Sequence, residues 1–510
     1  MLKSASDMSK EVAVIGAGPG GLASALLLRQ AGFRVTVIER MKRVGGRTSS
    51  IESHGFRFDR GPTFFLYPRI LEEIFQTIGR DLYEEIPMTR LDPQYRLIFG
   101  NSGHLEATNN VARMQEQIAQ FSRQDAERLP AFLEENRLKL QKFAPILENE
   151  FGSWTKLFSR DLIKLLPLVR PWKSLDSDLK SFFQDERIRL AFSFQSKYLG
   201  MSPYQCPSLF TILSFLEYDQ GVYHPIGGCS AVSERMGEIA EEMGVKFCLE
   251  EEVQEVLFSG RRPVGLISDK ARHSFDALVI NADFAQAMTK LIPQELRPSW
   301  SDKKIATRQY SCSTYMLYLG IKGEIDAAHH NIYFSNDYVQ NIEDISLNHT
   351  LPTDPSFYLE NPGVTDKSMA PKGMSSLYLL VPVSHVHPNI NWAQETMKFR
   401  EIAFQQLERI GLGNLRERVV FEKIFTPSDW RDQMEIYKGA TFSLAHNLLQ
   451  MLHFRPNNRF KDLEGVYLVG GGTHPGSGLP VIYSSARISC GLICEDFGVN
   501  FESKPAFGDA

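Results

Sequence analysis

The stretch VAVIGAGPGGLASALLLRQAGFRVTVIER, residues 12–40, decides the fold of this chain. It opens with a short apolar run rich in Val and Ile, which predicts a buried strand that ends in a glycine turn. Residues 21–32, GLASALLLRQAG, predict a helix that stops at Gly32, and residues 34–39, RVTVIE, predict a second strand. Strand, turn, helix and strand in this order predict a βαβ unit of an α/β fold.

The glycines of the first turn form the pattern of a dinucleotide-binding loop. Gly16 allows the tight turn, Gly18 lets a pyrophosphate approach the backbone, and Gly21 lets the helix pack closely on the strand. Glu39 ends the second strand, 18 residues after Gly21, where a carboxylate accepts hydrogen bonds from ribose hydroxyls. Glycine-rich turns also arise from packing alone, but here every part of the fingerprint occurs in order. We therefore expect a dinucleotide site.

The residues after Glu39 indicate which dinucleotide is bound. The segment RVGGRTSS, residues 43–50, adds a second glycine pair and Arg47. It resembles the flavin sites of the glutathione-reductase and amine-oxidase type, in which this arginine lies near the pyrophosphate, and so it implies FAD. A second fingerprint for NADPH is not evident, because GLGNLRER, which begins at Gly411, lacks the third glycine. This favours a flavin that is reduced by the substrate itself.

The composition is that of a folded globular protein of 510 residues, with 43% hydrophobic and 23% charged residues. The length predicts two domains, and the net charge of −5 gives no reason to expect a nucleic-acid partner. The six cysteines form no CxxC pair, so neither a disulfide framework nor a metal site is predicted. A signal peptide is not evident, and no apolar run reaches the ~18 residues of a spanning helix. We expect a cytoplasmic protein that can still lie on a membrane surface.

Buried strands recur far along the chain, which predicts a nucleotide domain assembled from separate pieces. FDALVINAD, residues 275–283, reads as a strand that ends in a polar turn. The glycine-rich segment from Gly465 onward predicts a strand, a loop and a closing helix. We expect a Rossmann-like FAD-binding domain of the glutathione-reductase type, interleaved with an α+β substrate domain. The FAD-binding domain is assigned to residues 1–85, 214–302 and 427–500, the substrate domain to residues 86–213 and 303–426, and a flexible tail to residues 501–510.

Further motifs give the chain a specific resemblance. They are FRFDRGPT (56–63), GVYHPIGG (221–228), YSCSTYMLYLG (310–320), HHNIYFSNDY (329–338), YKGATFSLAHNLLQMLHFRPNNR (437–459) and GGGTHPGSGLP (470–480). With them the chain resembles, over nearly its full length, the bacterial-type carotenoid desaturases, which are the phytoene and diapophytoene desaturase family within the flavin amine oxidase superfamily. Amine oxidases share the first and last motifs but not the middle ones.

The resemblance implies FAD-dependent desaturation of a linear C30 or C40 polyene precursor. Such a hydrocarbon carries no charge, so its recognition depends on burying apolar surface in a long tunnel. The family's reaction transfers a hydride to FAD while the adjacent carbon loses a proton, and a quinone or oxygen then accepts the electrons. The expected cofactor contacts are Gly16, Gly18, Gly21, Glu39, Arg40, Gly46, Arg47, Gly61, Pro62, Thr63, Val253, Asn281, Gly472, Thr473, Gly478, Pro480 and Val481.

The sequence offers no evident general base. His474 lies in the glycine-rich loop expected to face the flavin and is the candidate for proton handling, although a lone histidine is more often structural. His446 and His453 are seven residues apart on one expected helix face, and without a third ligand we favour packing over a metal site. Asp59 and Asp429 belong to the motifs but can simply cap or pack. Backbone N–H groups at the start of the closing helix are expected to stabilise negative charge on a reduced flavin.

Other functions of the same fold stay open at this point. Relatives oxidise a terminal methyl group of an acyclic carotenoid to an aldehyde, and others isomerise, saturate or dehydroxylate polyenes and triterpenes. An amine or protoporphyrinogen oxidase would be expected to hold polar or charged substrates, and the middle motifs argue against it. A lipid-carrying escort protein without a cofactor is disfavoured by the intact Glu39, Arg47 and C-terminal loop.

The segment SWTKLFSRDLIKLLPLVRPWKSL, residues 153–175, predicts a helix at a membrane surface. We expect Pro167 to end this helix and Val169 and Trp172 to extend its apolar contact. Asp161 and Ile163 depart from the pattern, so a helix packed on the protein's own core is the alternative. The expected basic face consists of Lys156, Arg160 and Lys164, and the expected apolar face of Trp154, Phe158, Leu162, Leu165 and Leu166.

Overall fold

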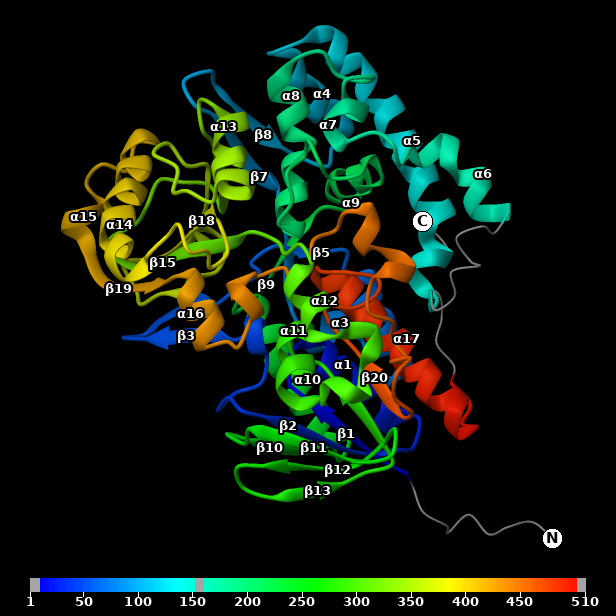
Figure 1. Cartoon of the computed structure of the whole chain (residues 1–510). Helices are drawn as coiled ribbons and strands as arrows, with labels where there is room; N and C mark the ends of the chain where they lie inside the picture. Colours follow the sequence, from blue (N-terminus) through cyan, green and yellow to red (C-terminus); the bar gives the residue numbers. More distant parts are fainter. Residues whose placement is uncertain (1–9, 152–159, 502–510) are drawn as a thin grey trace.

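The structure, a computed structural model, describes residues 10–151 and 160–501 (Figure 1). The expected tail after residue 501 and residues 153–159 of the candidate membrane segment therefore lie outside the described residues. Two large sheets dominate the rest. One lies at the lower end of the molecule in Figure 1 and the other at the upper left, with a group of helices at the upper right.

The lower sheet is parallel and confirms the predicted βαβ unit. Its strand order is β10-β2-β1-β14-β20, and each pair runs parallel. The strands between the edges are buried on both faces, which explains their continuous apolar sequences. The strands are β1 (Glu11–Ile15), β2 (Arg34–Glu39), β10 (Lys246–Leu249), β14 (Ala277–Ile280) and β20 (Val466–Leu468).

Three helices pack together beside this sheet. The first, α1 (Pro19–Gln30), begins just after Gly18 and lies between α10 (Cys229–Glu242) and α17 (Leu479–Phe497). It is buried from Pro19 to Leu28, which is why it carries apolar residues all round rather than on one face. Gly32, at a φ of +94°, turns the chain back toward β2. The first and last pieces of the sequence thus meet in one packed layer.

A small antiparallel sheet follows the parallel one at the lower edge of Figure 1. It has the order β11-β12-β13, and its neighbouring strands run antiparallel. Its strands are β11 (Val253–Ser259), β12 (Arg262–Ser268) and β13 (Arg272–Ser274), and α11 (Phe284–Leu291) packs beside it.

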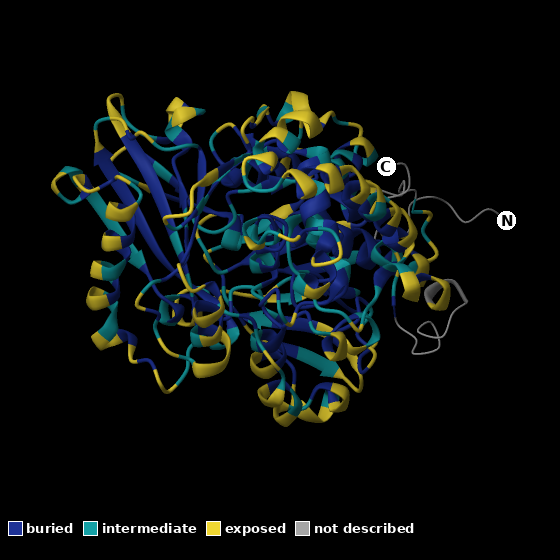
Figure 2. Cartoon of the chain, turned by 90° about the horizontal axis from the view of Figure 1, so that it is seen from above, coloured by how far each residue is buried: buried dark blue, intermediate teal, exposed yellow. Residues whose placement is uncertain are grey.

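The second large sheet has seven strands in the order β19-β15-β18-β17-β16-β7-β8. All neighbours are antiparallel except β16 and β7. One face packs on α14 (Trp392–Arg409) around a core of Leu, Phe and Trp side chains. In Figure 2 its central strands are largely dark blue, the colour of buried residues. The strands are β7 (Tyr95–Phe99), β8 (His104–Ala107), β15 (Ser313–Lys322), β16 (His330–Phe334), β17 (Phe357–Glu360), β18 (Met374–Val383) and β19 (Val419–Phe425).

The helices at the upper right of Figure 1 form a third group with an aromatic core. Phe132 and Phe192 lie 5.0 Å apart between ring centroids, and Phe192 lies 4.6 Å from Tyr218. The group consists of α4 (Val111–Ala119), α5 (Arg123–Glu148), α6 (Arg160–Val169), α7 (Leu175–Leu179), α8 (Glu186–Ala191) and α9 (Thr211–Gln220). The shorter elements used below are β4 (Phe56–Asp59), β9 (Val222–Pro225), α13 (Tyr338–Glu343), α15 (Leu415–Arg418) and α16 (Pro427–Asp432).

Two local predictions were wrong. The helix face expected to carry His446 and His453 does not exist, because this stretch forms two short 3₁₀ turns, Leu448–Gln450 and Leu452–Phe454. Backbone pairing between residues 310 and 444 holds the chain in an extended path here, against its helix-like spacing. Pro167 does not end α6, which continues to Val169, since a proline near a helix end removes only one backbone hydrogen bond.

The parallel sheet draws strands from all three intervals assigned to the FAD-binding domain, and the seven-stranded sheet draws strands from both intervals of the substrate domain. We keep this division as our proposal for the domain organisation. Within the described ranges, no helix combines the length and the apolar character that crossing a membrane requires.

Candidate functional site

A cavity of about 530 Å³ is lined by residues from the parallel sheet, the seven-stranded sheet and the helix group. Its volume falls in the usual range for ligand sites. We call the part around the first βαβ unit the glycine end; it is lined by Gly16, Gly18, Glu39, Gly46 and Val253. We call the part between α5 and α9 the apolar end; it is lined by Leu140, Phe143, Leu147, Leu209, Phe210, Leu213 and Leu216.

The glycine end is open because side chains are missing there. A Cβ atom on Gly18 would lie 3.1 Å from Nδ2 of Asn281, and one on Gly46 would lie 3.4 Å from Cα of Gly18. Asn281 itself lines the cavity and donates to the carbonyl of Gly16 at 3.1 Å. Gly21 does not line the cavity; its missing Cβ would stand 2.1 Å from the Gly16 oxygen, so it serves the close packing of helix on strand that was expected.

Glu39 lies in the cavity wall at the end of β2. Its carboxylate accepts the backbone N–H groups of Ala17 and Met41, each at 2.8 Å. Burial raises the pKa of Glu39, while these two hydrogen bonds lower it. The N–H donors thus fix the carboxylate at the edge of the cavity. Arg40 also lines the cavity and donates to the carbonyl of Gln433.

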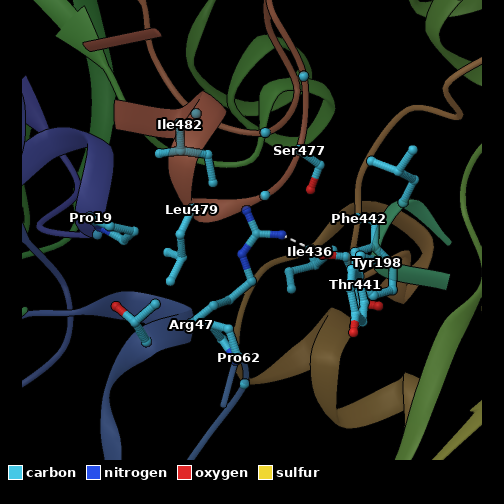
Figure 3. Close-up of a pocket in the computed structure, with 18 of the residues that line it drawn as sticks. Pro19, Arg47, Pro62, Tyr198, Ile436, Thr441, Phe442, Ser477, Leu479 and Ile482 are labelled. Carbon is cyan, nitrogen blue, oxygen red and sulfur yellow. Dashed lines mark hydrogen bonds between the residues drawn. The ribbon is translucent and has the colours of Figure 1, made fainter. Parts of the chain in front are cut away.

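Arg47 is the cationic group in the middle of the close-up in Figure 3, beside Pro62 and Leu479. Its Nη1 donates to the carbonyl of Thr441 at 2.6 Å. Burial lowers the pKa of Arg47, partly offset by the carboxylate of Asp283. A half-buried guanidinium that hydrogen-bonds mainly to a neutral carbonyl favours an anionic ligand nearby.

The segment Arg60–Thr63 crosses the cavity wall and is held by three tyrosines of the seven-stranded sheet. The hydroxyl of Tyr318 donates to the Arg60 carbonyl at 2.5 Å, and that of Tyr378 to the Gly61 carbonyl at 2.6 Å. The hydroxyl of Tyr358 lies 2.7 Å from Oγ1 of Thr63. These residues stand on three neighbouring strands, β15, β18 and β17. We call this arrangement the tyrosine ladder; it holds the segment that follows β4 on the seven-stranded sheet at the site.

The C-terminal loop contributes only part of what was expected of it. Gly478, Pro480 and Val481, at the start of α17, line the cavity. Gly472 and Thr473 do not. A Cβ atom on Gly472 would lie 2.6 Å from that of Phe284, and Thr473 donates its hydroxyl to the Pro456 carbonyl at 2.6 Å. Gly472 and Thr473 therefore contribute to the packing of the loop and not to the cavity lining.

His474 was predicted as the proton-handling residue, and the structure argues against that role. Its side chain is 2% exposed and does not line the cavity. Nε2 of His474 lies 3.2 Å from the carbonyl of Ile146 and 3.1 Å from that of Asn149, at the end of α5. These contacts connect the loop to the end of α5, whose residues Phe143 and Leu147 line the cavity.

Other motif residues have clear roles. Asp59 accepts the N–H groups of Cys229 and Ser230 at 2.7 and 2.8 Å and so caps α10; burial raises the pKa of Asp59 to about 7. Asp429 forms a capping box at α16. His446 lines the cavity, and its Nε2 accepts the N–H of Ser477 at 3.0 Å. Burial lowers the pKa of His446 well below its usual value, so this ring is neutral.

A buried histidine, His330, lies behind the tyrosine ladder and was not predicted from the sequence. His330 on β16 lies with Nδ1 2.7 Å from the hydroxyl of Tyr358, and Tyr358 lines the cavity. Both stand in strands that pair only in the folded sheet. The doublet of histidines in HHNIYFSNDY was the available signal, but nothing in the sequence placed it next to a tyrosine 28 residues away.

The residues at the glycine end fit FAD. Two glycine backbones in close approach, a buried carboxylate held by N–H groups and a half-buried arginine match the pyrophosphate and ribose parts of such a cofactor. The N-termini of α1 and α17 both point into the cavity wall, where Pro19 and Leu479 appear in Figure 3. Each provides unpaired N–H groups for an anionic ligand.

Comparison with known proteins places the chain. It is 40% identical over 496 residues to the 4,4'-diapophytoene desaturase (4,4'-diapolycopene-forming) of Methylomonas sp, covering 97% of both chains. It is 35% identical to the phytoene desaturase (lycopene-forming) of Pantoea ananas, covering 96% of this chain and 99% of that protein. The 4,4'-diapolycopen-4-al dehydrogenase of Metabacillus indicus is 34% identical, with 95% and 97% covered.

Solved structures agree in fold. An oxidoreductase from Methanosarcina mazei superposes with a TM-score of 0.64 at 17% identity, covering 95% of this chain and all of that one. Cyclohexylamine oxidase from Brevibacterium oxydans gives a TM-score of 0.60 at 17% identity, with 96% and 100% covered. Residues 19–494 match the family described as flavin containing amine oxidoreductase. The chain therefore belongs to this family of FAD-dependent oxidoreductases, within its group of carotenoid desaturases.

Proposed function

We propose that this protein desaturates a linear C30 or C40 polyene precursor of the phytoene or diapophytoene type. The observation that carries the proposal is the single cavity that joins the glycine end to the apolar end. A hydrocarbon in the apolar end would extend toward the cofactor without leaving apolar surroundings. Relatives named as desaturases of such precursors, at 35–40% identity, support the same substrate class.

In this proposal, the residues of the glycine end hold FAD. Glu39 accepts hydrogen bonds from the ribose hydroxyls, and the turn from Gly16 to Gly18 receives the pyrophosphate. Arg47 neutralises the negative charge of the cofactor. FAD, when bound, supplies the acceptor for a hydride from a saturated carbon. The protein positions the polyene, excludes water and accepts the proton that the neighbouring carbon loses. The remaining proposed contacts are Arg40, Gly46, Gly61, Pro62, Thr63, Val253, Asn281, Gly478, Pro480 and Val481.

We further propose that the apolar end opens toward a membrane. Phe143 lines the cavity and packs with Leu165 and Val169 of α6, so that these two helical residues face the protein's own core. Large apolar side chains are exposed nearby on α6, on the segment after it and on the two 3₁₀ turns after His446. We call them the apolar rim; they are Ile163, Leu166, Trp172, Leu448, Leu449 and Phe454.

The apolar rim and the cavity are connected through shared neighbours. Leu452 packs against the cluster of Phe143, Leu165 and Val169. Met451, the residue before Leu452, lines the cavity. An apolar substrate could therefore pass from the bilayer into the cavity without crossing water. Contact with a membrane would also give access to a quinone as electron acceptor, with oxygen as the alternative.

Oxidation of a polyene end group is the second candidate function. Lys197 lines the cavity with its Nζ 5.4 Å from the ring centroid of Tyr338, and burial lowers the pKa of this lysine to about 8. An ammonium group in the cavity wall is of no use to a pure hydrocarbon but can hold the oxygen of an aldehyde. A relative at 34% identity is named as an aldehyde dehydrogenase of such a polyene.

The decisive experiment is co-expression with a C30 or a C40 precursor synthase, with products read by absorption and mass. Desaturation removes hydrogen in pairs and moves the absorption to longer wavelength, whereas end-group oxidation adds the mass of oxygen. A product that has lost only hydrogen supports the first function, and an oxygenated product supports the second. Unchanged precursor with both chain lengths, from cells that contain the flavin-loaded protein, would contradict both.

A further inference from the structure

The proposed desaturation needs a group that accepts a proton at the cavity wall, and the residues around His330 form a chain suited to this task. Oγ1 of Thr63, the hydroxyl of Tyr358 and Nδ1 of His330 follow one another at 2.7 Å each. Thr63 and Tyr358 line the cavity, whereas His330 is fully buried behind them. Thr63 directly follows Pro62, which lies beside Arg47 in Figure 3.

The far side of His330 leads to further proton-binding groups. Its ring stacks on Phe64 at 4.1 Å and lies 4.4 Å from the ring of His329, which in turn lies 4.7 Å from the ring of His224 on β9. Glu360 stands directly opposite His330 in the pairing of β16 and β17. Nε2 of His329 is 3.7 Å from Oε1 of Glu360.

Among the described residues, Glu360 and His330 have fewer hydrogen-bond partners than the other buried carboxylates nearby. Oε1 of Glu360 and Nε2 of His330 make no hydrogen bond to any described residue, while Asp59 and Asp366 each accept several. A buried carboxylate and buried imidazoles that lack hydrogen-bond partners destabilise the folded protein. Groups of this kind are typical of functional sites. Burial raises the pKa of Glu360 to about 7 and lowers that of His330 well below its usual value.

We propose that Tyr358 is the residue that accepts the proton from the polyene and that His330 positions its hydroxyl and takes up the hydroxyl proton. The inference rests on the proposed desaturation. Departure of a hydride from one carbon leaves its neighbour strongly acidic. The neighbouring C–H bond breaks, its electron pair becomes the second bond of the new double bond, and its proton passes to the oxygen of Tyr358.

At the same time, the original hydroxyl proton of Tyr358 moves to Nδ1 of His330, so that Tyr358 stays neutral and His330 becomes an imidazolium. The neutral resting state of His330 leaves Nδ1 free to accept this proton. Glu360, across the strand pair, provides the carboxylate that balances the new positive charge. A weakly basic imidazole suffices, because a carbon next to a developing cation is a far stronger acid than an imidazolium.

The tyrosine ladder supplies a matched control for the test. Tyr358→Phe and Tyr318→Phe each remove one hydroxyl that holds the segment Arg60–Thr63, but only Tyr358 contacts a histidine. His330→Gln keeps a polar side chain next to Tyr358 but cannot take up a proton. All variants are compared with the wild-type protein per bound flavin, after their flavin content and Tm have been measured.

The flavin-loaded protein is mixed without oxygen with a C30 or C40 precursor in liposomes, and flavin bleaching and product formation are followed in one turnover. We expect Tyr358→Phe and His330→Gln to slow product formation on the order of 10²-fold. With deuterium at the carbon that loses the proton, both variants should show a larger isotope effect than the wild type, and Tyr318→Phe should not. A purely structural role would lower flavin content or Tm but leave the isotope effect unchanged.

A second readout needs no substrate. In protein with ¹⁵N-labelled histidine, the signal that disappears in His330→Gln should show a neutral ring at pH 6, and Tyr358→Phe should shift its Nδ1 resonance. A charged His330 at pH 6 would overturn the inference. So would equal rates and isotope effects for Tyr358→Phe and Tyr318→Phe in a protein whose wild type is bleached. A wild type that no precursor bleaches would instead overturn the proposed function, and this inference with it.

Discussion

Gly18 contributes to the candidate site through the side chain that it lacks. A Cβ atom on Gly18 would lie 3.1 Å from Nδ2 of Asn281 and 4.0 Å from the carbonyl oxygen of Gly45, at the place proposed for the pyrophosphate. The same local logic explains Glu39, which two backbone N–H groups hold at the cavity edge. These contacts lie within one βαβ unit and its neighbouring strand, and local chain geometry therefore dictates them.

Gly18→Val should abolish flavin binding. The Val Cβ would stand 3.1 Å from Nδ2 of Asn281, and its methyl groups would enter the space proposed for the pyrophosphate. We expect the purified variant to lack the yellow flavin absorption while keeping its circular dichroism spectrum. Gly413→Val is the matched control, because no atom lies within 4 Å of the position of its Cβ. Full flavin content in Gly18→Val would show that this loop does not bind the pyrophosphate.

At the scale of elements, local sequence predicts the position of a single strand, turn or helix. It does not predict the contacts between elements that are far apart in the chain. The βαβ unit, the hairpin after residue 250 and the closing helix α17 were predictable, because apolar spacing and glycine positions specify them. The tyrosine ladder was not, since it depends on the register of β15, β18 and β17. The surroundings of His474 were not predictable for the same reason, because the fold of its loop decides which elements this side chain contacts.

Glu217 on α9 shows how such distant packing creates a measurable property. It is fully buried, and its Oε2 accepts Tyr95 Oη and Gln195 Nε2, each at 2.9 Å. Its Oε1 has no hydrogen-bond partner among the described residues. Burial raises the pKa of Glu217 to about 7, so the native state holds a proton that the unfolded chain releases above its ordinary pKa near 4.5. This contribution to stability is complete below pH 4.5 and is lost as the pH rises through 7.

Glu217→Gln should therefore stabilise the protein at pH 8 and change little at pH 5. Glutamine imitates the protonated acid, so the variant avoids a buried charge that costs on the order of 3 kcal/mol at high pH. The measurement is the Tm of both proteins between pH 5 and 8.5, with the exposed Glu116→Gln as control. A constant difference in Tm across this range would mean that Glu217 does not titrate near pH 7.

At the scale of the whole molecule, the two large sheets close one cavity between them. The tyrosine ladder anchors the segment Arg60–Thr63, which belongs to the nucleotide-binding part, on strands of the other sheet. The helix group completes the cavity, because α5 and α9 supply the walls of its apolar end. The sequence suggested this interleaving through its alternating intervals, but the contacts that achieve it come from side chains far apart in the chain.

This arrangement has a consequence for the electron source. The sequence carries one dinucleotide fingerprint, and the glycine end that it builds fits the FAD itself. NADPH should therefore fail to bleach the flavin without oxygen, whereas a polyene precursor in liposomes should bleach it. Stopped-flow absorption measures both. Rapid bleaching by NADPH without precursor would indicate a monooxygenase-like reaction instead.

The apolar rim determines how the whole molecule would meet its substrate. Trp172 is 68% exposed and Leu449 74% exposed, beside a cavity that is itself apolar. Exposed side chains of this size near a tunnel are explained if they insert into a bilayer, because each gains roughly 1.5–3 kcal/mol when fully buried. Lys156 of the expected basic face lies outside the described residues.

Changing Leu166, Trp172 and Leu449 together to Ser should release the protein from anionic liposomes while its flavin content stays the same. A loss of about 3 kcal/mol from three partly inserted side chains corresponds to a partition coefficient lowered on the order of 10²-fold. Liposome co-sedimentation measures it, and the double variant Met397→Ser and Val420→Ser, whose positions are exposed on α14 and β19, is the control. Equal partitioning of both variants would place the membrane contact elsewhere. Reduced turnover with liposome-bound precursor but normal turnover with detergent-dispersed precursor would show that the rim serves substrate entry rather than the chemistry, because only the path from bilayer to cavity has changed.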